Sequence, residues 1–231
     1  MGFIVKNTTI LSPIDIIAPH ICRGCGAIGS PLCNCCKNNI IMTHRNICPN
    51  CKTDNPTGSC LRCSGLPSVY TVADRSTVIG TLVHDLKYSS ARAIAKPLAE
   101  VVDATLPVIV GDVTVVPLPT ISRHIRERGF DHTLEIAKQL IKLRPDWTYK
   151  TILVRANDTV QVGASESNRL KQAKKAYRIN PKQSIDEATT YLLIDDVWTT
   201  GASMKEAHKT IVKAGAAKTI MLALAVSRIE N

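Results

Sequence analysis

Aromatic residues and long apolar runs are scarce in this sequence. Phe, Trp and Tyr make up 4% of the 231 residues, so the stacking platforms of many single-strand-binding folds are not evident. No stretch reaches the roughly 18 uninterrupted apolar residues of a membrane span. Residues 1–17 lack the basic start and unbroken apolar run of an export signal. We therefore expect a cytoplasmic protein with no membrane span.

Acidic residues are also few compared with basic ones. Lys and Arg total 29 against 19 Asp and Glu, and the resulting net charge of +10 favours polyanionic partners such as nucleic acid or phosphorylated compounds. Hydrophobic residues make up 45% of the chain, which is enough for a sizeable core and excludes a disordered, collagen-like or coiled-coil protein. The length fits one ordinary domain with a small appendage.

Cysteine is absent from residues 64–231, because all nine cysteines lie between Cys22 and Cys63. Eight of them form four C-x-x-C pairs, and each such turn can supply two thiolates to a tetrahedral zinc site. Disulfides or redox-active pairs fit a cytoplasmic chain less well, so two structural zinc ions are predicted. Sequential and interleaved pairings both satisfy the count. The sequential pairing, which we favour, gives the ligand sets Cys22, Cys25, Cys33, Cys36 and Cys48, Cys51, Cys60, Cys63.

The ninth cysteine, Cys35, is interpreted as a non-ligand. Two sites of four thiolates each carry a formal charge of −2, which offsets the +4 of residues 1–68 (six basic and two acidic residues). The remaining +6 belongs to residues 69–231, so a polyanion is expected to bind there rather than at the cysteine-rich segment. We expect an N-terminal extension at 1–19, a double zinc ribbon at 20–66 and an α/β domain at 67–231.

From residue 69 onward, short apolar segments alternate with helix-like segments. Strands are predicted at 69–75, 112–119, 150–155, 190–196 and 219–226. Apolar residues three or four positions apart predict helices at 78–86 and 136–143, and a third helix is expected at 203–214. This alternation predicts a doubly wound α/β fold with a parallel sheet flanked by helices, whose ligands bind at the carboxyl ends of the strands.

The run YLLIDDVWTTGAS, residues 191–203, is the most informative segment. Asp195 and Asp196 follow an apolar strand, and their carboxylates can accept hydrogen bonds from vicinal hydroxyls, directly or through a magnesium ion. The next loop has small residues at a helix N-terminus, a suitable site for an anion. It consists of Thr199, Thr200, Gly201, Ala202 and Ser203. Diol and phosphate recognition so close together suit a ribose 5-phosphate, although an ordinary strand-to-helix turn is the alternative.

This run resembles the phosphoribosyl pyrophosphate motif of type I phosphoribosyltransferases, and with the cysteine pairs the chain resembles the ComF family. VVPLPTISRHIRERGFDHTLEIA (115–137) is similar to that family's Pro-x-Pro and Arg-x-x-Arg-Gly-Phe segment, and LKYSSARAIAKPLAE (86–100) to its earlier helix. The resemblance spans nearly all of residues 20–231. The sequence departs from the family at Asp131 and His132, where Asn-Gln is commoner, and at Gln172, where Asn is usual.

The resemblance implies a phosphoribosyltransferase domain that binds phosphoribosyl pyrophosphate and Mg²⁺, with an acceptor that the sequence does not identify. The catalytic residues would be Asp195 and Asp196, which contact the ribose hydroxyls directly or through Mg²⁺, and Arg126 and Arg128, which stabilise the leaving pyrophosphate. Pro119, Thr120 and Arg123 would help to bind it. The alternative for the three arginines is a solvated helix face with Glu127 as their partner. Positioned cations stabilise the charge that develops on a departing pyrophosphate.

The segment 164–180 carries a second set of basic residues. If it is helical, four of them share one face and could follow the phosphates of single-stranded DNA, or could simply be solvated. These are Lys171, Lys174, Lys175 and Arg178. The ComF resemblance implies handling of DNA taken up during natural competence, with a helicase-like partner. Two function classes remain: a phosphoribosyltransferase, or a non-catalytic adaptor that binds nucleotides or single-stranded DNA.

Overall fold

The computed structural model describes residues 20–42, 44–51, 53–54, 60, 63, 67, 69–89, 91–156 and 176–227. Its elements in chain order are α2 (Asn34–Ile41), β1 (Arg45–Ile47), β2 (Val69–Asp74), α3 (Val78–Tyr88), the short 3₁₀ helix η1 (Arg92–Ile94), α4 (Ala95–Thr105), β3 (Val113–Pro117), α5 (Ser122–Arg128), α6 (His132–Leu143), β4 (Thr148–Tyr149), β5 (Leu153–Arg155), β6 (Tyr177–Ile179), β7 (Thr190–Trp198), α8 (Ala202–Lys213) and β8 (Lys218–Val226). None of the helices in these ranges is long and apolar enough to cross a membrane.

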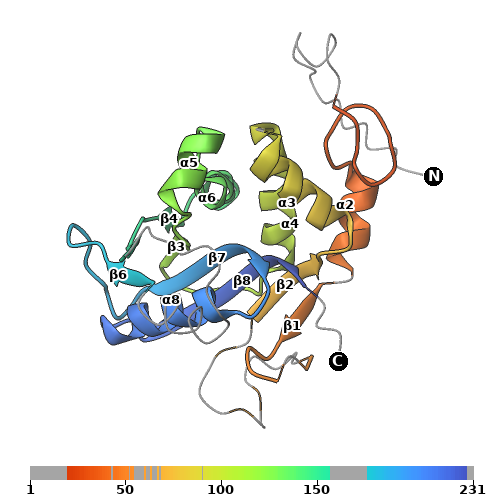
Figure 1. Ribbon diagram of the computed structural model, residues 1–231. Helices are drawn as coiled ribbons and strands as arrows, with labels where there is room; N and C mark the ends of the chain where they lie inside the picture. Colours follow the sequence, from red (N-terminus) through yellow and green to blue (C-terminus); the bar gives the residue numbers. More distant parts are fainter. Residues whose placement is uncertain are drawn as a thin grey trace.

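The centre of the molecule is a six-stranded sheet in the order β1-β2-β8-β7-β3-β4. Strands β2, β8, β7, β3 and β4 are parallel, and β1 pairs with β2 in the antiparallel direction. Helices cover both faces of this sheet (Figure 1). The predicted α/β class with a parallel sheet is therefore confirmed.

Alternation along the central strand β7 supplies both hydrophobic cores. Leu192 and Ile194 pack in the core with α3, α4 and α6 on one face, whereas Tyr191 and Leu193 pack in a second core with α8 on the other. All four side chains are at most 2% exposed. A parallel strand covered on both faces is apolar in consecutive positions, which explains the continuous apolar run in the sequence.

The connections leave strands β3 and β7 in opposite directions. The chain runs from β3 through α5 and α6 to β4 at one edge of the sheet, and from β7 through α8 to β8 on the other side. Neighbouring parallel strands whose connections diverge in this way leave a crevice at their carboxyl ends, the usual ligand position in such sheets. The fold thus places a candidate site between the loops that follow β3 and β7.

The predicted strand at 150–155 is only partly present. Residues Leu153–Arg155 form β5, which pairs in the antiparallel direction with β6 in a separate two-stranded sheet. The parallel edge strand of the main sheet is instead the two-residue β4, which was not predicted. The apolar pattern indicated an extended segment, but it carries no information on which strand the segment pairs with.

The cysteine-rich segment is joined closely to the α/β unit. Strand β1 forms one edge of the main sheet, and Leu32 and Ile40 belong to the core under α3 and α4. Arg23 Nε donates to Asp85 Oδ2 on α3 at 2.7 Å, and Lys37 pairs with Glu100 on α4. The segment between the cysteines thus shares its core and one sheet edge with the rest of the chain.

Candidate functional site

Loop 118–121, which follows β3, is held by backbone and side-chain hydrogen bonds. Leu118 N donates to Ile194 O of β7 at 2.9 Å. The carboxylate of Asp131 accepts from Thr120 Oγ1 at 3.1 Å and also caps α6, where it accepts from Thr133 N at 3.1 Å. Because one carboxylate serves both the loop and the helix N-terminus, the loop is fixed relative to α6. Asp131, a departure from the family pattern, therefore has a structural role here.

A cavity of about 260 Å³ lies where the two loops meet. It is lined on the β3 side by Pro119 and Thr120, and on the β7 side by Asp195, Asp196 and Ser203. Several basic or aromatic side chains complete the lining, namely Lys87, Tyr88, His124, Arg128, His132, Arg155 and Tyr177. Two carboxylates surrounded by cationic groups suit a ligand that carries both hydroxyls and negative charge.

A second, smaller hollow of about 40 Å³ lies beside the first. The loop after β7 lines it with Thr199, Thr200, Gly201, Ala202 and Ser203, so the structure brings all five predicted loop residues together. Asp195 and Ser203 line both hollows. The acid thus stands at the junction between the larger cavity and the loop at the N-terminus of α8.

Gly201 allows this loop to turn into α8. Its φ is 72°, in the left-handed region, and a Cβ at this position would lie 2.0 Å from Cζ2 of Trp198. A side chain would therefore be strained by the backbone and would also overlap the buried indole. Glycine is therefore required at position 201 by packing as well as by turn geometry.

Asp196 is buried and already has two partners. Lys87 Nζ lies 2.5 Å from Asp196 Oδ2, and His132 Nε2 contacts the same oxygen. Lys87 is at the end of α3 and His132 begins α6, so these two helices each point a side chain at the end of β7. This carboxylate oxygen is occupied by nitrogen donors, and a magnesium ion does not fit on it in this arrangement.

His132 is oriented by Arg128. Arg128 NH1 lies 3.1 Å from His132 Nδ1, and a guanidinium nitrogen can only donate. Nδ1 therefore accepts, and the proton of the neutral ring is on Nε2, from which it is donated to Asp196. The guanidinium of Arg128 also lies over the ring of Tyr88, 5.3 Å from its centroid.

The two adjacent acids have opposite pKa shifts. Burial and the negative charge of Asp196 raise the pKa of Asp195 to about 8. Burial would also raise the pKa of Asp196, but the hydrogen bond from His132 and the positive charge of Lys87 outweigh it and lower that pKa to about 2. Asp196 is therefore the charged member of the pair at neutral pH, and Asp195 is the more readily protonated one.

The predicted arginines have different surroundings. All three lie on α5: Arg128, at its end, lines the larger cavity, whereas Arg123 and Arg126 line neither hollow. Arg123 Nε lies 3.3 Å from Glu127 Oε1. This pairing agrees with the alternative in which the arginines lie on a solvated helix face with Glu127 as their partner. α5 buries none of its residues.

Sequence reasoning did not assign Lys87, His132, Arg155 and Tyr177 to the site. Arg155 NH1 donates to Pro119 O at 3.4 Å, and its guanidinium lies 5.6 Å from the centroid of the Tyr177 ring. Lys87 and His132 had a local signal, because they lie in the two segments that resemble the ComF family, 86–100 and 115–137. The others reach the cavity through the tertiary fold.

The eight C-x-x-C cysteines form two groups with sequential pairing. Cys22, Cys25, Cys33 and Cys36 form one group, and Cys48, Cys51, Cys60 and Cys63 the other; within each, all Sγ atoms lie within 4.8 Å of one another. Cys35 belongs to neither group and is exposed. The interleaved alternative is therefore excluded by the fold.

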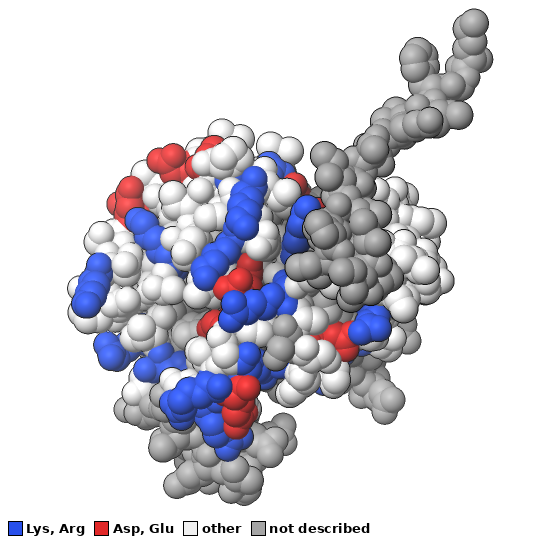
Figure 2. Space-filling view, turned by 90° about the horizontal axis from the view of Figure 1, so that it is seen from above, with Lys and Arg blue, Asp and Glu red and all other residues white. Residues whose placement is uncertain are grey.

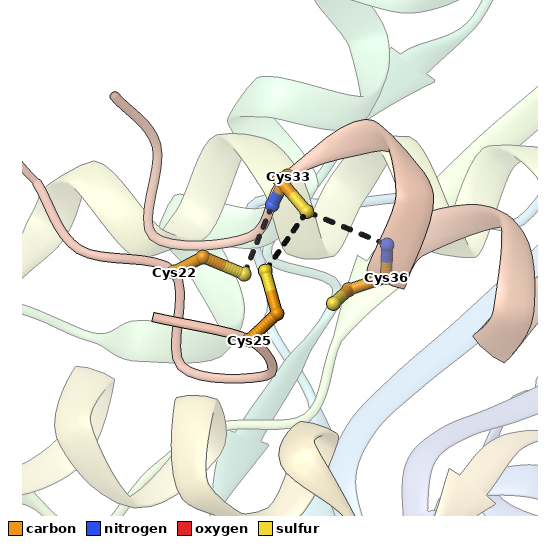
Figure 3. Close-up of side chains that lie close together, drawn as sticks. All are labelled: Cys22, Cys25, Cys33 and Cys36. Carbon is orange, nitrogen blue, oxygen red and sulfur yellow. Dashed lines mark hydrogen bonds between the residues drawn. The ribbon is translucent and has the colours of Figure 1, made fainter. Parts of the chain in front are cut away.

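The sulfur positions fit a tetrahedral metal site. Cys25 and Cys33 Sγ are 3.6 Å apart, and Cys51 and Cys60 Sγ are 3.7 Å apart. Four thiolates at ~2.3 Å from a zinc ion would be about 3.8 Å from one another. In Figure 3 the four sulfurs of the first group point towards a common centre, and Cys33 N donates to Cys22 Sγ at 3.3 Å.

Backbone groups also favour the thiolate form of Cys22 in the first group. Burial would raise the pKa of the Cys22 thiol, but hydrogen bonds from the backbone N–H groups of Cys33, Cys25 and Gly24 lower it to about 6. Gly24 lies close to the group, because a Cβ there would be 2.7 Å from Cys36 Sγ. A metal ligand must lose its proton, so these donors assist binding.

The four basic residues proposed to follow DNA phosphates lie largely outside the described residues. Lys171, Lys174 and Lys175 fall in the segment 157–175, which the structure does not describe. Arg178 lies in strand β6, so the expectation that all four share one helical face is wrong. The helical spacing could not reveal that the chain is extended by residue 177.

The surface seen from above carries basic and acidic residues together. Lys and Arg side chains are spread widely over it, with Asp and Glu among them (Figure 2).

No family model matches the chain. It is 27% identical over 213 residues to the DNA utilization protein YhgH of Escherichia coli strain K12, covering 85% of this chain and 91% of the relative. The protein of the same name from Salmonella typhimurium is 29% identical over 202 residues, covering 80% and 86%. These relatives therefore align with most of the chain.

Solved structures of two hypoxanthine phosphoribosyltransferases are similar at a low level. The Trypanosoma cruzi enzyme has a TM-score of 0.37 and 13% identity, covering 62% of this chain and 75% of that one. The Staphylococcus aureus enzyme has a TM-score of 0.31 and 14% identity, covering 58% and 62%. TM-scores this low assign no function.

Proposed function

We propose that the paired hollows bind phosphoribosyl pyrophosphate and that the protein is a ComF-like phosphoribosyltransferase. The observation that carries this proposal is the position of Asp195, which lines both the anion-type loop at the start of α8 and the larger cavity ringed by cations. A ribose at Asp195 would direct its 5-phosphate into the small hollow and its pyrophosphate into the large one. The arrangement of the two hollows matches the order of groups in that compound.

In this proposal each residue has a separate task. A carboxyl oxygen of Asp195 accepts a hydrogen bond from a ribose hydroxyl. The loop 199–203 receives the 5-phosphate at the N-terminal end of α8. Lys87 and Arg128 face the larger cavity, where positive charge would stabilise pyrophosphate as the bond at C1 breaks.

A ligand-dependent stability measurement tests the proposal. Phosphoribosyl pyrophosphate is expected to raise the melting temperature, because a ligand that binds only the folded state stabilises it. Asp195→Asn should reduce this increase strongly, whereas the exposed Asp146→Asn should leave it unchanged. A full increase in a folded Asp195→Asn variant would remove this acid from the site. Pyrophosphate release measured across a panel of bases would then show whether transfer occurs and to which acceptor.

The second candidate function is a DNA-binding adaptor. The relatives named DNA utilization proteins favour it, since they align over 80–85% of this chain. In this proposal the protein acts in DNA uptake during transformation, binds single-stranded DNA and contacts a helicase-like partner.

A salt titration of DNA binding distinguishes the lysines of segment 164–180 from the arginines of α5 as the DNA-binding surface. If Lys171, Lys174 and Lys175 contact single-stranded DNA, changing all three to Gln should weaken its salt dependence. The slope of the logarithm of the binding constant against the logarithm of the salt concentration should become shallower by about 0.7 for each phosphate that is no longer neutralised. Arg123→Gln with Arg126→Gln serves as the matched variant on α5. If phosphoribosyl pyrophosphate competes with the strand while the lysine variant binds normally, the DNA phosphates occupy the loop at α8 instead.

The two cysteine groups are proposed to hold one structural zinc ion each. All four positions of each site are filled by thiolates, which leaves no position open for substrate and indicates a structural role. Metal analysis of reduced protein should return two zinc ions per chain. A value of one or none would contradict the assignment.

A further inference from the structure

The contacts of Asp196 show how the negative charge of its carboxylate is neutralised. Its Oδ2 atom is shared by Lys87 Nζ at 2.5 Å and by His132 Nε2. The Asp196 side chain is 11% exposed and that of Lys87 is 19% exposed, so solvent screens this pair only weakly. A carboxylate at the end of a strand in a sugar-phosphate site would otherwise attract a divalent cation.

We propose that Lys87 is the built-in cation of this site and takes the position at Asp196 that a divalent ion would take. The ammonium group neutralises the carboxylate, while its place in the lining of the larger cavity leaves it able to contact the oxygens of an anionic ligand. Lys87 is then a ligand-binding residue.

The surroundings of Lys87 support this assignment. It is in the last turn of α3, and the neighbouring Asp85 already pairs with Arg23 at 2.7 Å. Asp85 is therefore engaged elsewhere, and Asp196 is the carboxylate that the structure pairs with Lys87. Because His132 donates to the same oxygen, a metal ion there would have to displace Lys87 and also lie beside a donor N–H. Both effects disfavour metal binding.

Titration with Mn²⁺ alone tests the inference. Replacing Lys87 with a neutral residue should raise the affinity of the zinc-loaded protein for Mn²⁺ at least tenfold, since the competing cation is gone. Lys87→Met and Lys87→Gln are both used, so that one folded variant suffices, and the exposed Lys142→Met is the matched control. Adding Asp196→Asn to either variant should abolish the gain.

The possible results separate clearly. A rise in Mn²⁺ affinity that is confined to the Lys87 variants and abolished by Asp196→Asn supports the proposal. An affinity equal to that of the unchanged protein, or no measurable binding in any variant, overturns it, because Lys87 would not be what keeps a metal ion away from Asp196.

Binding of inorganic pyrophosphate without added metal is the second measurement. The unchanged protein should bind it, and the Lys87 variants should bind it at least tenfold more weakly, with recovery when Mg²⁺ is added. Equal affinity in the Lys87 variants would overturn the ligand-binding role. The inference shares its site with the proposed function, but the Mn²⁺ titration does not depend on phosphoribosyl pyrophosphate. Each can therefore fail without the other.

Discussion

Asp195 and Asp196 are neighbours in the sequence but have different environments. Successive residues of a strand point to opposite sides, so only Asp196 faces Lys87 and His132. Asp195 instead accepts a hydrogen bond from Asp196 N at 2.9 Å and borders both hollows. One acid is fixed within the protein, and the other borders the two hollows that we propose as the ligand site.

This difference predicts a pH effect on stability. The folded state holds the proton of Asp195 up to its raised pKa of about 8, whereas the unfolded state releases it near 3.8. The contribution of Asp195 to the free energy of unfolding should therefore fall as pH rises through this window, by less than the ~1.4 kcal/mol per pH unit that one proton can give. Asp196, whose pKa is lowered, keeps its contribution throughout and loses it only in strong acid.

Denaturation curves measured from about pH 5.5 to about pH 8.5 check this effect. The stability difference between the unchanged protein and Asp195→Asn should decline with rising pH, whereas Asp146→Asn should run parallel to the unchanged protein. A constant difference for Asp195→Asn would show that this carboxyl is already ionised throughout the range.

Among the elements, the loop between β7 and α8 depends on a single glycine. Gly201→Ala combines a left-handed backbone with overlap of the Trp198 ring, so we expect a decrease of about 2 kcal/mol or more in the free energy of unfolding and weaker phosphate binding. Gly129→Ala is the matched control, because Gly129 has a similar φ of 78° but nothing within 4 Å of an added Cβ. It should cost about 1 kcal/mol. Equal decreases in urea denaturation would show that the indole moves aside.

Sequence patterns predicted those elements whose signals are local. The run from β7 into α8 combines an apolar strand, two acids and a small-residue loop within residues 191–203, and the structure keeps that order. The contacts of Lys87 and His132 with Asp196 join residues far apart in the chain, so no spacing rule could reveal them. The pairing of β5 with β6 was missed for the same reason, because a short apolar run does not specify its partner strand.

At the scale of the whole molecule, the first cysteine group and the α/β unit are coupled. Leu32 and Ile40 are in the main core, and Arg23 binds α3 next to the end that carries Lys87. Cys25→Ser should therefore lower the melting temperature of the whole protein, by roughly 5 °C more than Cys51→Ser. Both cysteines are exposed and each belongs to one of the two groups, which makes them a matched pair. Calorimetry that showed an equal or larger decrease for Cys51→Ser would contradict this coupling.

Both edge strands of the main sheet are very short. Strand β1 has three residues and β4 has two, whereas β2, directly inside β1, has six. Short edge strands offer few unpaired backbone groups for pairing with a second chain. Since β1 lies between the two cysteine groups, detachment of that segment would uncover the longer β2 and its unpaired amides. We therefore expect that loss of the cysteine-rich segment would favour edge-to-edge aggregation.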